Sequence, residues 1–156
     1  MVGVRRSVKT DAIIDRFVER LAGNGVGFEK IASAPWIERF EERLQTKLPR
    51  SFSSLVNRYS FPVFEFSGVV FFSNSGTDDE DDLVIAPFRD KHLGAAVANG
   101  FVQIGRPDTG SYDLVCFNTR GRRRGGEYPI VVLDHEPLLQ HDRLKINQSI
   151  GTSFWI

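Results

Sequence analysis

The stretch that decides the fold is FVQIGRPDTGSYDLVCF, residues 101–117. Its two ends, residues 101–105 and 112–117, are short runs rich in β-branched and aromatic residues, which favour strands. The segment between them, RPDTG at residues 106–110, contains the proline, aspartate and glycine that turns prefer. The stretch therefore predicts two strands that are connected locally.

Similar runs lie on both sides of this stretch. Residues 63–66 and 69–72 are aromatic and β-branched and are broken at Ser67-Gly68, so they read as two more strands. Residues 83–88 and 130–134 are also expected to be strands. The polar, acidic residues 73–82 predict a loop.

The N-terminal third of the chain has helical spacing instead. Apolar residues recur at helical spacing over residues 11–21, and residues 35–46 show the same pattern after a proline in the first turn. Pro49 opens a third, short helix, and residues 90–98 predict a fourth. Because helices come first and locally connected strands follow, we expect a single α+β domain over residues 1–156, with an antiparallel or mixed sheet of five to six strands flanked by helices.

Composition restricts the possible classes of protein. The 156 residues carry a net charge of zero, which gives no global attraction to nucleic acid or anionic membranes. A single cysteine, Cys116, excludes an internal disulfide and favours a reducing compartment. The sequence shows neither a secretory signal nor a run long enough to span a bilayer, so we expect a cytoplasmic protein that does not bind membranes.

Four pieces of the sequence, taken in order, resemble the SUKH superfamily. They are WIERFE at residues 36–41 with Leu48-Pro49 after it, FVQIG at 101–105, DLVCF at 113–117 and PIVVLDHE at 129–136. This superfamily contains a yeast regulator of cell-wall assembly and killer-toxin resistance, together with many bacterial toxin-immunity proteins. The match covers about residues 36–154, and residues 1–34 form an N-terminal helix and connector.

The resemblance implies a set of residues that maintain the fold. These structural landmarks are Trp36, Glu41, Leu48, Pro49, Phe52, Gly105, Asp113, Cys116, Pro129, Asp134, His135, Glu136 and Phe154. Two departures from the family pattern stand out. Tyr112 precedes Asp113 where the family usually has glycine, and Ser153-Phe154 is followed by Trp155-Ile156 where the family usually continues into a helix.

Charge is unevenly distributed, which bears on partners. Residues 59–88 carry six acidic residues and no basic ones; the six are Glu65, Asp78, Asp79, Glu80, Asp81 and Asp82. A solvated loop is the simplest interpretation, and the alternative is a negative surface that steers toward the basic cleft of a nuclease toxin. The loop with Arg120, Arg122, Arg123 and Arg124 is too short a basic patch to predict nucleic-acid binding.

Catalytic and metal sites receive little support from the residues. Cys116, Asp134 and His135 could form a nucleophile set, but a cysteine in an apolar strand is by default a buried thiol. The three histidines, His92, His135 and His141, show no ligand spacing, and residues 78–82 lack the pattern of a calcium loop. We therefore expect no catalytic residue, metal or cofactor.

These observations lead to one main functional hypothesis. The chain is expected to be a non-enzymatic immunity protein that binds and neutralises a cognate bacterial toxin, with a nuclease as the favoured target. The alternative is a regulatory scaffold domain like the yeast family member. The sequence leaves the toxin's identity, the contact surface and the oligomeric state open.

Overall fold

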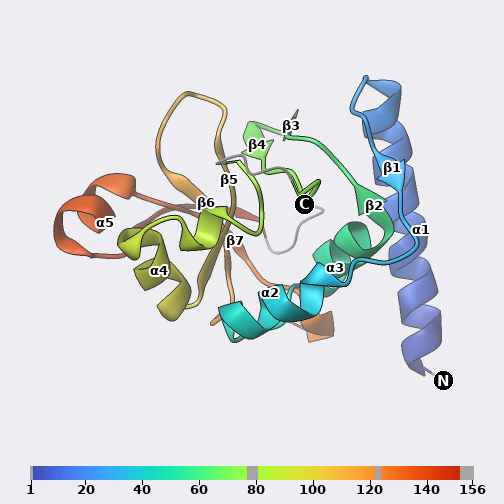
Figure 1. The fold of residues 1–156 in the computed structure, drawn as a ribbon, viewed down its shortest axis with the longest axis horizontal. Coiled ribbons are helices and arrows are strands. Elements are labelled where there is room, and N and C mark those ends of the chain that lie inside the picture. The colour runs from blue at the N-terminus through green and yellow to red at the C-terminus, as the bar shows by residue number, and fades with distance from the viewer. Residues whose placement is uncertain (1, 77–80, 122–123, 152–156) are drawn as a thin grey trace.

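The computed structural model describes residues 2–76, 81–121 and 124–151. These residues form five α-helices, which Figure 1 shows along the chain. The helices are α1 (Val2–Gly23), α2 (Trp36–Leu44), α3 (Arg50–Arg58), α4 (Lys91–Ala98) and α5 (His135–His141). Two 3-10 turns, η1 (Ala86–Phe88) and η2 (Arg124–Gly126), complete the helical segments.

The strands form two antiparallel sheets, which confirms the predicted α+β class. A small sheet pairs β1 (Glu29–Lys30) with β2 (Tyr59–Ser60). The main sheet has the order β3-β4-β5-β6-β7-β8, so every strand pairs with its neighbour in the chain. Its strands are β3 (Phe64–Phe66), β4 (Val69–Phe71), β5 (Phe101–Pro107), β6 (Leu114–Asn118), β7 (Ile130–Leu133) and β8 (Ile146–Gly151).

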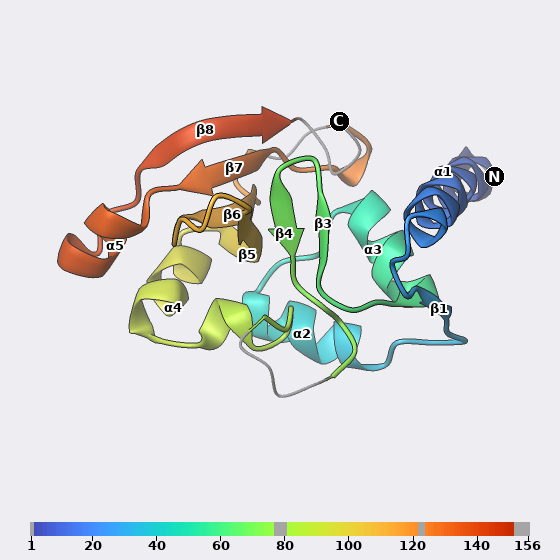
Figure 2. The ribbon, with the colours of Figure 1, turned by 90° about the horizontal axis from the view of Figure 1, so that it is seen from above.

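Each face of the main sheet has its own core. The larger core joins α1, α2 and α3 to one face, through residues such as Phe52, Ile104 and Phe117. The smaller core packs α4 and α5 on the other face, against Leu114, Cys116 and neighbouring side chains. Figure 2 shows α4 and α5 on one side of the molecule and α1 and α3 on the other.

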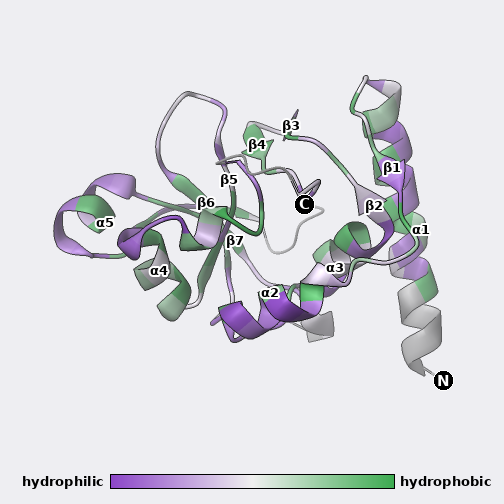
Figure 3. Cartoon of the chain, viewed as in Figure 1, coloured by the Kyte–Doolittle hydropathy of each residue, from purple (hydrophilic) through white to green (hydrophobic). Residues whose placement is uncertain are grey.

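The helices form where the apolar periodicity predicted them. α1 extends well beyond the predicted residues 11–21, and Figure 3 shows hydrophobic and hydrophilic residues alternating along it. Ile37, Phe40 and Leu44 form the buried side of α2, and Pro49 precedes α3 as predicted. Asp90 caps α4, because its carboxylate accepts the backbone N–H groups of two residues in the first turn.

Glycine is required where β4 and β5 cross closely. A Cβ atom at Gly105 would lie 2.3 Å from the carbonyl oxygen of Val70 on β4. The turn between β3 and β4 places Ser67 and Gly68 at positive φ, as a two-residue hairpin turn demands.

Two expectations about secondary structure were incomplete or wrong. Residues 83–88 form a turn and η1 rather than a strand, because Asp82 accepts the N–H of Val84 through its side chain and that of Ala86 through its carbonyl. Residues 135–151, for which no helix or strand was predicted, form α5 and β8. Within the described residues, no helix combines the length and the apolar character that crossing a membrane requires.

Candidate functional site

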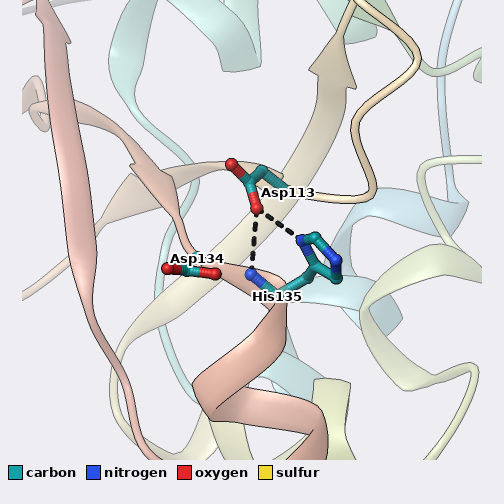
Figure 4. Close-up of side chains that lie close together, drawn as sticks. All are labelled: Asp113, Asp134 and His135. Carbon is teal, nitrogen blue, oxygen red and sulfur yellow. Dashed lines mark hydrogen bonds and ion pairs between the residues drawn. The ribbon is translucent and has the colours of Figure 1, made fainter.

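Three polar landmarks meet at one end of the main sheet. Asp113 precedes β6, while Asp134 and His135 follow β7 (Figure 4). The Oδ1 atom of Asp113 accepts the backbone N–H of His135 at 3.0 Å and lies 2.6 Å from Nδ1 of its ring. Asn147 on β8 donates a longer hydrogen bond of 3.4 Å to the other oxygen of Asp113. We call these four residues the sheet-end cluster.

Asp134 connects three elements at this point. Its side chain accepts the N–H of Glu136 and so caps α5. Its own N–H donates to the carbonyl of Lys145 at 2.8 Å, just before β8. The cluster therefore determines how the chain leaves β7, turns through α5 and returns as β8.

The environment of Asp113 favours its charged form. Burial raises the pKa of this carboxyl, but the hydrogen bonds from the ring and backbone of His135, with a smaller contribution from Asn147, outweigh burial. The pKa of Asp113 is therefore held below its ordinary value. Asp113 is consequently a partly buried carboxylate that is ionised at neutral pH.

Asp113, Asp134 and His135 also form a set with metal-ligand geometry that sequence analysis missed. One ligand atom from each lies within 4.8 Å of the others. The missed signal is the antiparallel pairing of Leu114 with Leu133, which places the residue before one strand beside the residues after the other. Since Oδ1 of Asp113 and Nδ1 of His135 already bond to each other, an ion using those two atoms would have to displace that bond.

A cleft of about 500 Å³ opens beside Asp113. It lies between the turn at Ser67, the loop after β5 and strand β8. Val69 on β4 and Ile150 on β8 both line it, although three strands separate β4 from β8 in the sheet. The sheet must therefore be curved here, which agrees with the register shifts between β5 and β6 and between β7 and β8. We call this hollow the Asp113 cleft.

A second polar cluster holds α1 against α3, and sequence analysis did not identify it. Arg58 contacts both carboxylate oxygens of Asp15, at 2.7 and 2.9 Å, and the hydroxyl of Tyr59 donates to the same carboxylate at 2.5 Å. Ser54 donates to Asp11, one turn earlier on α1. We call these five residues the α1 clamp. Residues 30 or more apart in the sequence give no periodic signal of such pairing.

The contacts within the α1 clamp shift the pKa values of Asp15 and Tyr59. The hydrogen bond from Arg58 is the main cause that lowers the pKa of Asp15, against a smaller opposing effect of burial. Burial and the hydrogen bond to Asp15 raise the pKa of Tyr59 to about 12. At neutral pH, Asp15 is therefore an ionised acceptor and Tyr59 a protonated donor, as their hydrogen bond requires.

Cys116 lies in the core, as predicted for a cysteine in an apolar strand. Its side chain is fully buried on β6 within the smaller core, and burial raises the pKa of the thiol far above its ordinary value. A reactive cysteine needs an accessible thiolate. Cys116 therefore fills space in the core and is not poised for nucleophilic attack.

The histidines do not converge. His92, at the start of α4, lies 2.9 Å from Asp142 after α5, whereas His135 contacts Asp113 and His141 is exposed. The contact between His92 and Asp142 links the two helices of the smaller layer.

The six acidic residues proposed for partner binding differ in their surroundings. Asp82 is only 1% exposed and shapes the turn before η1, so it is wrong to count it as a surface contact. Asp81 pairs with Arg106, and Glu65 is exposed on β3. Asp78, Asp79 and Glu80 lie outside the described residues. The five consecutive acids therefore do not form one uniformly solvated loop.

Most of the other landmarks make internal contacts. Glu41 accepts the backbone N–H of Leu48 at 2.7 Å, which holds the turn that leads to Pro49. The ring of Phe52 packs edge-on against Phe117, at 5.0 Å between centroids. Trp36 is half-buried against Phe40, and Pro129 is buried.

The remaining residues singled out by the sequence are either exposed or outside the described residues. Glu136 is exposed in the first turn of α5, and Arg120 is exposed at the start of the arginine-rich loop. Arg122, Arg123, Phe154 and Trp155 lie outside the described residues.

Comparison with known proteins adds no relative. Neither the protein-family models nor the curated proteins contain a match to this chain. The resemblance to the SUKH superfamily accordingly rests on the four sequence pieces alone.

Proposed function

We propose that this chain is a non-enzymatic protein-binding domain that neutralises a cognate toxin by occluding its active site, with a nuclease domain as the favoured target. The class of target follows from the resemblance to immunity proteins. The scaffold domain of the yeast type remains the alternative within the same superfamily.

One observation supports binding over catalysis: most of the described landmark residues make contacts inside the fold. Cys116 is buried, and Gly105 lacks the Cβ atom that would clash with the carbonyl of Val70 on β4. Glu41 accepts the backbone N–H of Leu48. Asp113 and His135 bond to each other. Side chains committed in this way maintain a scaffold, and selectivity then comes from the loops and surface around it.

Surface charge gives a means of approach to a basic target. Glu65 on β3 and Asp108 in the loop after β5 are exposed carboxylates. Asp78, Asp79 and Glu80 add charge from outside the described residues. Negative surface charge raises the rate of association with a basic cleft, and this effect weakens as salt rises.

The test is direct binding to the toxic domain of a secreted protein encoded beside this chain, measured by titration calorimetry. A triple variant with Asp78→Asn, Asp79→Asn and Glu80→Gln should bind about tenfold more weakly at low salt, chiefly through a slower association rate. The control variant Glu38→Gln, on the exposed side of α2, should bind as the native chain does.

Two outcomes would count against the proposal. Absence of binding to the encoded toxin would contradict the immunity function, and capture of resident proteins of the same cell would then favour the scaffold alternative. Unchanged affinity of the triple variant at low salt would remove the acidic segment from the mechanism.

A further inference from the structure

The Asp113 cleft has an unusual balance of chemical groups. Among the described residues that line it, Asp113 is the only charged one. Hydroxyl and amide side chains surround it, such as those of Thr109, Ser111 and Asn147. Val69 and the half-buried Ile150 contribute apolar surface. The cleft thus offers one carboxylate at the edge of an uncharged, partly apolar hollow.

The carboxylate of Asp113 has capacity for a further partner. Its Oδ1 atom receives both hydrogen bonds from His135, while Oδ2 receives, among the described residues, the longer, 3.4 Å bond from Asn147. An ionised carboxylate has about four acceptor positions, so Oδ2 can accept at least one more donor. The bonds from His135 also fix the direction of the carboxylate in advance, which lowers the cost of binding.

Charge around the cleft selects the sign of the ligand. Asp108, which is exposed, stands in the chain between the lining residues Pro107 and Thr109 and adds negative charge at the rim. No lysine or arginine is found in the described lining to offset Asp113. An anion would meet repulsion at this point, whereas a cation would gain a charge-assisted hydrogen bond.

We propose that the Asp113 cleft receives a lysine or arginine side chain of the bound protein, with the cationic head on Asp113 and the methylene stem along Val69 and Ile150. Such side chains combine an apolar stem with a charged tip, which matches this lining. The assignment rests on the proposed function as a toxin-binding domain. A nuclease contacts phosphates through such cations, so sequestering one of them would also block its substrate.

The first test uses small probes that copy the two side chains. n-Butylguanidinium and n-butylammonium should shift the backbone amide signals of Val69, Ser111 and Asn147 in an NMR titration, with dissociation constants of about 1–10 mM for such small ligands. Butanoate and n-butanol, which have similar stems and no positive charge, should leave these signals unmoved. Equal shifts with butanoate or butanol, or none with either cation, would overturn the proposal.

Three variants locate the site. Asp113→Asn should weaken binding of the guanidinium probe at least about tenfold. Thr109→Lys should block it by placing a tethered ammonium in the cleft, and this exposed position allows the substitution without burying a charge. Ser33→Lys adds the same charge at an exposed residue outside the cleft lining and should bind the probe normally. Native binding by Thr109→Lys would contradict the proposal even if Asp113→Asn proved unstable.

The outcomes separate this inference from the proposed function. Toxin binding without probe binding would refute the cleft assignment and leave the toxin-binding function intact. Probe binding without toxin binding would support a cation site in the cleft and refute the claim that a toxin side chain occupies it. If 1,4-diaminobutane bound more than about tenfold tighter than n-butylammonium, the cleft would be a polyamine site and the side-chain assignment would be wrong.

Discussion

The α1 clamp and the sheet-end cluster both use a carboxylate to join segments that are distant in the sequence, yet their surroundings differ. In the clamp, the side chains of Asp15 and Arg58 are 38% and 32% exposed. In the sheet-end cluster, those of Asp113 and His135 are 19% and 25% exposed. The partner of the carboxylate also differs, because Arg58 offers a guanidinium that binds both carboxylate oxygens, whereas His135 offers a ring nitrogen and a backbone N–H to one oxygen.

This contrast separates a cluster that holds the fold together from one that borders the proposed binding surface. Water screens the more exposed clamp, so each of its bonds contributes less to stability. The sheet-end cluster is better shielded, and it also borders the Asp113 cleft. We infer that the clamp secures α1 on the scaffold, while the sheet-end cluster sets the shape of the surface that meets a partner.

The largest effect is expected from forcing β4 and β5 apart at Gly105. Gly105→Ala should lower the free energy of unfolding by about 3 kcal/mol, because its Cβ atom cannot coexist with the carbonyl of Val70 unless β4 and β5 separate. Gly94→Ala is the matched control, since its Cβ atom would meet nothing within 4 Å and alanine favours the helix at this position on α4. Urea unfolding measures both. A loss below about 0.5 kcal/mol for Gly105→Ala would show that the strands tolerate separation.

The next effect comes from the sheet-end cluster itself. Asp113→Asn should cost about 1–2 kcal/mol, because neutral hydrogen bonds to His135 replace charge-assisted ones. Asp108→Asn, at an exposed position, should change stability by less than about 0.5 kcal/mol.

The dependence of the unfolding free energy on acid pH tests the same contribution of Asp113. The pKa of Asp113 is lowered in the folded chain, so its contribution to stability is present above the ordinary value of 3.8 and is lost as pH falls through the folded value. Asp113→Asn should therefore flatten the acid limb of the stability profile. An unchanged acid limb would mean that His135 does not stabilise the charged carboxylate.

A smaller loss is expected at the α1 clamp. Arg58→Met keeps much of the side-chain volume but removes the donor to Asp15, and should cost about 1 kcal/mol at low salt and less at high salt. Arg16→Met, at an exposed residue next to Asp15 on α1, is the control and should be nearly neutral. A cost above that of Asp113→Asn would reverse the ranking of the two clusters.

The smallest effect distinguishes the clusters at high pH. The pKa of Tyr59 is raised from 10.0 to about 12, so its contribution to stability is complete below pH 10.0 and is lost as pH rises to about 12. Tyr59→Phe should reduce the fall in unfolding free energy across this window. Tyr112→Phe, which alters a tyrosine that is 80% exposed, should leave the fall unchanged. Identical profiles for the two variants would show that the bond from Tyr59 to Asp15 is not maintained.

Local sequence signals predicted much of the fold. The period of apolar residues located α2 and α3, and Pro35 and Pro49 located their starts. The turn chemistry of Ser67-Gly68 and residues 106–110 identified the two hairpins on either side of Gly105. These features depend on neighbours within a few residues, which is why they can be read from the sequence alone.

The remaining features depend on contacts that no local pattern records. Residues 83–88 have the composition of a strand, but the buried Asp82 imposes a turn on them. β8 carries few large apolar residues and is a strand because β7 pairs with it. The partnership of Asp113 with His135 follows from the register of β6 and β7, and the Asp113 cleft follows from the curvature of the whole sheet.

The central claim is that the landmark residues act on one another to hold a binding scaffold. A double-mutant cycle with Asp113→Asn and His135→Gln, read as free energies of unfolding, tests it most directly. We predict a coupling energy of about 1–2 kcal/mol between the two positions, as expected for a shielded, charge-assisted pair. Additive losses, agreeing within about 0.3 kcal/mol, would show that the two residues do not depend on each other and would contradict the account.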